Sequence, residues 1–167
     1  MNTKPKKQIL YGEANYKNMV MENGYYVDKT MFIHLVEKYK SLVFLRPRRF
    51  GKSLWCTTLT YYYDINEKDN FQQLFGHTAV GKDPTPWHNR FMVLSLDFSI
   101  VNPSGGIEDI MYRFNKQCNI GLQSIIWRYG KYFGKSMEID LNEDASINLK
   151  EILTKIRGQS RKTKKMC

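Results

Sequence analysis

The residues most able to do chemistry stand together at positions 46–53, which read Arg-Pro-Arg-Arg-Phe-Gly-Lys-Ser directly after the apolar run 42–45. A triphosphate needs several donors that converge on it, and a tight loop of backbone N–H groups, a lysine and a metal-binding hydroxyl supply them. We therefore expect Gly51 to let the backbone approach phosphate, Lys52 to reach phosphate oxygens and Ser53 to hold Mg²⁺. A helix that starts near Gly51 adds its positive N-terminal end.

The match to a full phosphate loop is incomplete, because Arg46 occupies the position of the first glycine. Pro47 fits a fixed bend at the loop entry, and two arginines add cationic donors where such loops are usually neutral. The alternative is a basic surface turn whose serine starts a helix. The predicted nucleotide-binding residues are Arg46, Pro47, Arg48, Arg49, Phe50, Gly51, Lys52, Ser53 and Leu54.

A second Gly-Lys-Ser stands at residues 134–136, so the tripeptide alone is not decisive. The first copy follows a short apolar run and precedes residues 54–59, which can continue as a helix. The second follows a helix-like segment and precedes residues 137–141, where polar and apolar residues alternate. Only the first copy has the order strand, loop, helix, so it is the predicted phosphate loop.

Periodicity and turn signals predict the elements that position this loop. Strands are expected at residues 41–45 and 91–98, with a loop-rich connection over 65–90. Helices are expected over 31–39, from Ser53 to about Asp64, over 107–129 and over 149–156. This alternation predicts an α/β fold, and because two strands do not complete a sheet, we expect an incomplete parallel sheet of the P-loop NTPase type with flanking helices.

The expected domain organisation has three parts, namely an N-terminal extension and helix at 1–40, a partial P-loop domain at 41–156 and a basic tail at 157–167. With 167 residues, of which 42% are hydrophobic and 14% aromatic, the chain can bury a core. No apolar stretch approaches a membrane span, and no secretion signal is evident, so a cytoplasmic protein without a membrane partner is predicted. The three cysteines have no metal-ligand spacing.

The net charge of +10 raises nucleic acid as a partner, and much of that charge sits near the two ends. A basic tail of this kind binds polyanions weakly and without sequence preference. A non-specific nucleic-acid-binding module is therefore one alternative function. A gene fragment without independent function is another.

Three blocks resemble the bacterial family of predicted AAA-ATPase-like proteins. They are Tyr-Val-Asp-Lys-Thr at 26–30, Phe-Leu-Arg-Pro-Arg-Arg-Phe-Gly-Lys-Ser-Leu at 44–54 and Leu-Asp-Phe-Ser at 96–99. The resemblance runs from about residue 9 to about residue 156 and makes Arg46 the family's own loop variant. It implies an ATPase-like domain that takes ATP and Mg²⁺.

Proteins that this chain resembles are typically longer, with a nuclease-like domain of the restriction-endonuclease type and an acidic Mg²⁺ motif on a third strand. The basic residues 157–167 stand where that motif is expected, so we expect a truncated member without a Walker B carboxylate, in which ATP binding is predicted and hydrolysis is doubtful. For Asp97, we favour a role in capping a turn over a contact to Mg²⁺. For Asp28, we favour a role in capping a helix over a contact to the nucleotide.

Overall fold

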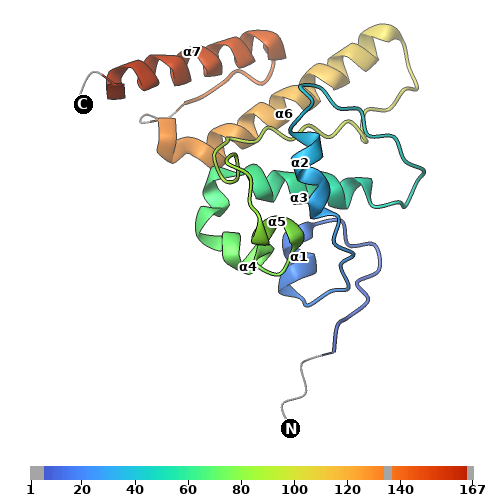
Figure 1. The fold of residues 1–167 in the computed structure, drawn as a ribbon. Helices are drawn as coiled ribbons and strands as arrows, with labels where there is room; N and C mark the ends of the chain where they lie inside the picture. The colour runs from blue at the N-terminus through green and yellow to red at the C-terminus, as the bar shows by residue number, and fades with distance from the viewer. Residues whose placement is uncertain (1–5, 134–136, 165–167) are drawn as a thin grey trace. The chain divides into compact units, whose positions relative to one another are not determined.

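The computed structural model describes residues 6–133 and 137–164, and the chain divides into two compact units, Met1–Phe91 and Met92–Cys167 (Figure 1). The elements of the first unit are α1 (Tyr16–Met21), the 3₁₀ helix η1 (Thr30–Phe32), α2 (Ile33–Val36), α3 (Lys52–Tyr63), the 3₁₀ helix η2 (Ile65–Asn70), α4 (Phe71–Phe75) and α5 (Ala79–Lys82). The second unit contains α6 (Ile107–Phe133) and α7 (Ala145–Lys164). None of the helices in these ranges is long and apolar enough to cross a membrane.

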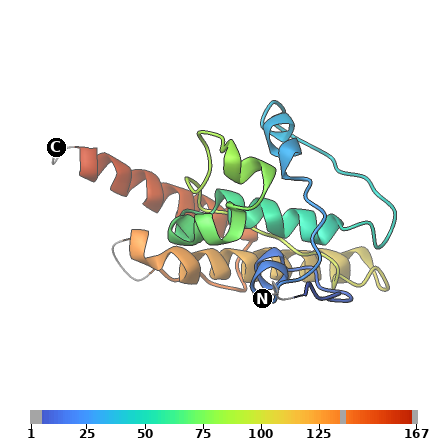
Figure 2. The ribbon, with the colours of Figure 1, turned by 60° about the horizontal axis from the view of Figure 1, so that its bottom comes forward.

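The prediction of a parallel sheet is wrong, because the residues that the structure describes form helices and no sheet. Their β-structure consists of two isolated bridges, one between Gln8 and Gly24 and one between Asp64 and Phe91. Residues 41–45, the first predicted strand, form part of an exposed connection without regular secondary structure between α2 and α3 (Figure 2). Val43 is 79% exposed. Within the described ranges, residues 42–45 form no backbone–backbone hydrogen bond. An apolar run becomes a strand only when a neighbouring chain segment completes its hydrogen-bond ladder, and no segment that the structure describes does this for residues 42–45.

In the second predicted strand, 91–98, Phe91 forms an isolated bridge with Asp64, and residues 93–96 pack on a helix instead of joining a sheet. The Val93 N–H donates to the Tyr129 hydroxyl of α6 at 2.8 Å. Gly121 of α6 leaves room for this approach, since a Cβ there would lie 2.5 Å from a methyl group of Leu96. The glycine that weakens the helix by propensity is therefore the position at which the extended segment meets it.

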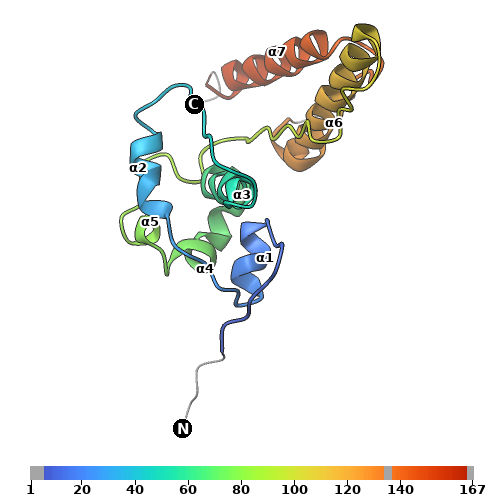
Figure 3. The same cartoon turned by 90° about the vertical axis from the view of Figure 1, so that its right-hand side faces the viewer.

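The core of the first unit forms on one face of α3. Tyr62 of α3 is fully buried and makes edge contacts with Phe75, whose ring stacks on Tyr16 of α1. The Tyr16 hydroxyl donates to the Leu74 carbonyl at 2.7 Å, so its polar end is satisfied inside the core. Figure 3 views α3 nearly end-on, with α1 and α2 on different sides of it.

The helix predicted after Ser53 is confirmed as α3, and the long helix after residue 107 is confirmed as α6. The connection 65–90 is more helical than predicted, because polar side chains start its short helices. Asp64 accepts from the Asn66 N–H at 2.8 Å at the start of η2, and Thr78 accepts from the Gly81 N–H at 3.2 Å at the start of α5. In the second unit, α7 begins before residue 149 and continues through 157–164.

Buried asparagines fix the turn between α6 and α7. The Asn119 amide donates to the carbonyls of Leu141 and Glu143 at 3.2 and 2.7 Å, and Asn148 donates to Asn119 Oδ1 at 2.9 Å. Both asparagines are buried, so these bonds replace the water that the amides lose on folding.

Asp28 joins the starts of two helices in the first unit. Its carboxylate accepts from the Thr30 N–H at 2.8 Å, the Thr30 hydroxyl at 2.7 Å and the Ala79 N–H at 2.7 Å. Burial raises the pKa of Asp28, but the hydrogen bonds from Thr30 and Ala79 outweigh it and hold the pKa below its ordinary value. The capping role expected for Asp28 fits these contacts.

Replacing Asp28 with Asn is expected to lower the free energy of unfolding by about 1–3 kcal/mol at neutral pH, because an amide NH₂ then faces an N–H donor. A lowered folded-state pKa stabilises the fold above the unfolded-state pKa of about 4, and this contribution is lost as the pH falls through the folded-state value. Urea unfolding at pH 7 and at pH 3 checks both points, since the two proteins should differ less at pH 3. Asp69→Asn, at an exposed carboxylate, is the control and should change stability by less than about 0.5 kcal/mol.

Candidate functional site

The loop before α3 contains two residues in the left-handed region, Arg49 with φ 64° and Gly51 with φ 72°. Phe50 between them does not have a positive φ. Alternation of this kind turns successive backbone N–H groups toward one side, which is how many anion-binding turns are built. A Cβ on Gly51 would meet no heavy atom within 4 Å, so the backbone there faces open space.

Lys52 folds back across this loop. Its ammonium donates to the carbonyl of Arg46 at 2.7 Å and to that of Pro47 at 2.8 Å. An ammonium has three N–H donors, so one remains for a ligand after these two bonds. The lysine therefore both holds the loop in its curled form and carries positive charge at the start of α3.

The N-terminus of α3 offers further donors. The first backbone bond of the helix runs from the Trp55 N–H to the Gly51 carbonyl at 2.9 Å, so the N–H groups of residues 52–54 precede the helical ladder. No side chain caps this end and no acidic residue lies in the first turn. The exposed Ser53 hydroxyl forms no hydrogen bond with any described residue. Such a helix start favours an anion electrostatically.

A cavity of about 500 Å³ lies beside these groups. Part of its wall is the loop and the start of α3, and the rest comes from a segment forty residues earlier that the sequence did not single out. Its lining residues are Tyr11, Gly12, Glu13, Ala14, Arg49, Gly51, Lys52, Ser53 and Leu54. Residues 11–14 carry no motif, and the left-handed Gly12, with φ 78°, is the one local signal that could have pointed to them.

One stripe of α3 holds the earlier segment in place. Residues 53, 57 and 61 are spaced four apart and so share one face of the helix. The Thr57 hydroxyl donates to the Ala14 carbonyl at 2.7 Å and accepts from the Tyr16 N–H at 3.1 Å. One turn further on, the Asn15 amide donates to the Tyr61 hydroxyl at 3.0 Å. These bonds place the end of the segment along the same stripe as Ser53.

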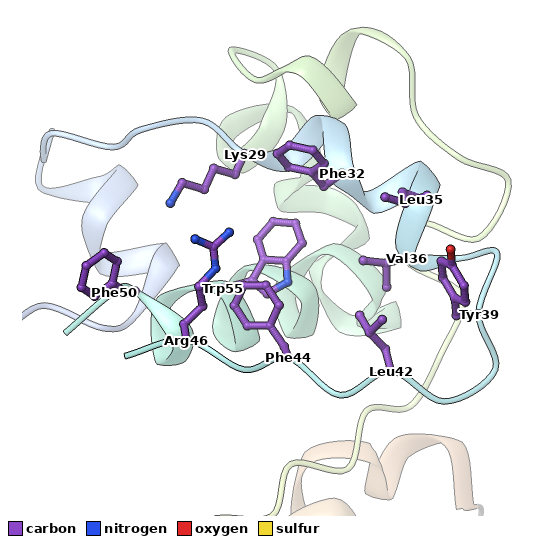
Figure 4. A pocket seen from close by; sticks show the side chains of 11 residues that line it. Lys29, Phe32, Leu35, Val36, Tyr39, Leu42, Phe44, Arg46, Phe50 and Trp55 are labelled. Carbon is purple, nitrogen blue, oxygen red and sulfur yellow. The ribbon is translucent and has the colours of Figure 1, made fainter. Parts of the chain in front are cut away.

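A separate apolar groove of about 240 Å³ borders the loop on the side of α2 (Figure 4). Leu42 and Phe44, from the run 42–45, are among the residues that line this groove, and both are exposed. The sequence predicts instead that this run forms a buried strand. Arg46 and Lys29 lie beside Trp55 toward one end, and the Arg46 guanidinium carbon is 5.6 Å from the centre of the Phe44 ring. Arg46 therefore lines this groove and not the cavity beside Lys52.

The predicted binding residues thus divide between two surfaces. Arg49, Gly51, Lys52, Ser53 and Leu54 line the cavity, whereas Arg46, Phe50 and Gly51 line the apolar groove. Pro47 contributes its carbonyl to Lys52, and Arg48 is exposed and lines neither of these two surfaces.

The other candidates from the sequence lie elsewhere. The exposed carboxylate of Asp97 accepts from the Ser99 N–H at 2.8 Å, and hydrogen bonds from the backbone and side chain of Ser99 lower its pKa, which fits the expected turn cap. The second Gly-Lys-Ser, at 134–136, falls outside the described residues.

A loop curled around a lysine at an uncapped helix start is an arrangement that can bind an anion. The chain matches the family model for predicted AAA-ATPases over residues 10–165, so it belongs to this family. It is also 41% identical over 78 residues to a protein of Azotobacter chroococcum mcd 1 named "Uncharacterized protein in vnfD 5'region"; the match covers 46% of this chain and 14% of that protein. No solved structure matches the chain.

Replacing Lys52 with Ala is expected to change the free energy of unfolding by about 1 kcal/mol or less, since the two bonds to loop carbonyls are exposed and water can replace them. Amide hydrogen exchange of Trp55, whose N–H donates to the Gly51 carbonyl of the loop, should become faster while that of buried Tyr62 is unchanged. Urea unfolding and exchange measured on the same protein check this. A loss of several kcal/mol would mean that Lys52 supports the fold and not the loop alone.

Proposed function

We propose that this chain binds a nucleoside triphosphate with Mg²⁺, ATP being the nucleotide that the family description implies, in the cavity between residues 11–14 and the start of α3. The observation that carries this proposal is the Lys52 ammonium, folded across the loop beside the open N-terminus of a twelve-residue helix. The phosphates are the part of the nucleotide that these donors suit.

Each polar group has a distinct role in this arrangement. Phosphate oxygens accept from the free N–H groups of residues 52–54 and from the remaining N–H of Lys52, and Arg49 adds a guanidinium on the same cavity wall. The Ser53 hydroxyl is one oxygen ligand for Mg²⁺. The other ligands would be phosphate oxygens and water, which is how Mg²⁺ is commonly held beside nucleotides.

Binding, and not turnover, is the activity that we assign to these residues. Phosphoryl transfer needs a group that orients the attacking water and carboxylates that hold the metal. Glu13 is the one carboxylate among the residues that line the cavity, and a single carboxylate does not supply both the metal ligands and the group that orients the water.

Titration of the purified chain with ATP and Mg²⁺ by calorimetry tests the proposal. Lys52→Ala should weaken binding about ten- to a hundredfold, because a hydrogen bond to a charged group contributes about 1.5–3 kcal/mol. Lys40→Ala, at an exposed lysine away from the cavity, is the matched control and should leave the affinity unchanged.

Equal affinities for wild type and Lys52→Ala would overturn the proposal. So would binding of single-stranded DNA that falls steeply with salt and is not displaced by ATP, since that result favours the basic charge of the chain as its functional feature.

A further inference from the structure

We propose that residues 11–14 form the nucleoside end of this cavity and that the Glu13 carboxylate accepts hydrogen bonds from the ribose hydroxyls of the bound nucleotide. This inference rests on the proposed function, because it assigns the part of the ligand that the phosphate loop does not hold. The residues concerned carry no sequence motif for nucleotide binding.

The first argument is position. The stripe of α3 at residues 53, 57 and 61 fixes the later part of the segment through Thr57 and Tyr61 and has Ser53 at its cavity end. A ligand whose phosphates lie at Ser53 and Lys52 therefore has the remainder of the same cavity, walled by residues 11–14, for its sugar and base. Ala14, the last residue of the segment, accepts a hydrogen bond from Thr57 of α3 before any ligand binds, so this end of the segment needs little ordering on binding.

The second argument is charge. Arg49 and Lys52 make one part of the cavity wall cationic, whereas Glu13 on the other segment is acidic. Hydrogen bonds from the Asn15 N–H and the Asn18 side chain lower the pKa of Glu13, so it is ionised at neutral pH. A carboxylate repels phosphate but accepts from neutral hydroxyl donors. This difference orients a nucleotide with its phosphates toward Lys52 and its hydroxyls toward Glu13.

The third argument is room for close approach. Gly12 is left-handed, and a Cβ on it would meet no heavy atom within 4 Å, as at Gly51 across the cavity lining. The neighbouring Tyr11 is 89% exposed, and no other ring packs on it within the described ranges. Its free face is suited to stacking on a base.

The apolar groove of Figure 4 is the competing place for the base, because it is lined by Trp55, Phe44 and Phe50. Lys52 and Ser53 do not line that groove, whereas both line the cavity with residues 11–14. If the phosphates of a nucleotide contact Lys52 and Ser53, they lie in the cavity, and the sugar and base can extend from them toward residues 11–14 without leaving it.

Three ligands separate the two proposals: ATP, dideoxy-ATP, which lacks both ribose hydroxyls, and inorganic tripolyphosphate, each titrated with Mg²⁺. Wild type should bind ATP about ten- to a hundredfold more tightly than dideoxy-ATP, the effect of losing hydrogen bonds to a charged acceptor. Glu13→Gln should reduce this ratio to about threefold or less and should not weaken tripolyphosphate binding. Lys52→Ala should weaken all three ligands.

Leu42→Ala, in the apolar groove, is the matched control and should leave every ratio unchanged. A wild-type protein that binds ATP, dideoxy-ATP and tripolyphosphate equally, with Lys52 dependence, refutes the nucleoside subsite and keeps the phosphate site. Failure to bind any of the three overturns both proposals. If Leu42→Ala lowers the ratio of ATP to tripolyphosphate affinity and Glu13→Gln changes no ratio, the base lies in the groove and the inference is wrong.

Discussion

The placement of α3 is the constraint on which the first unit depends. Tyr62 on one face of this helix is fully buried against Phe75, while Thr57 and Tyr61 on another face hold the chain that leads into α1. Its first turn carries the loop lysine. Because one rigid helix performs all three tasks, the hydrophobic core determines where the loop and residues 11–14 stand relative to each other.

Lys52 supplies hydrogen-bond donors for backbone carbonyls that the loop leaves without a partner. A chain that curls through Arg49 and Gly51 turns backbone carbonyls as well as N–H groups out of any regular ladder. The ammonium accepts no hydrogen bond but donates three, so it satisfies the Arg46 and Pro47 carbonyls and still leaves net positive charge at the helix start. A polar uncharged side chain could make the same two bonds but would not attract an anion.

Sequence reasoning located the loop and α3, because Gly-Lys-Ser and the residues after it carry their structure locally. It did not find residues 11–14, whose place in the cavity depends on a hydroxyl at Thr57 more than forty residues away. It also assigned strands at 41–45 and 91–98, since apolar runs of this length fit a buried strand equally well whether or not a partner exists. Pairing is a long-range property, which a single run of residues does not encode.

The geometry of the candidate site does not depend on the predicted sheet, and the contacts explain why. The hydrogen bonds that shape the cavity join residues 14–16 with α3, link Glu13 to Asn15, or run within residues 46–55. None of these bonds depends on a strand beside 42–45. Burial of that run would change the exposure of the apolar groove and of Arg46, but the curl from Pro47 to Gly51 is closed by Lys52 itself. The geometry of the loop is therefore a property of the loop and its helix, and a sheet would add rigidity to backbone donors that are already in place.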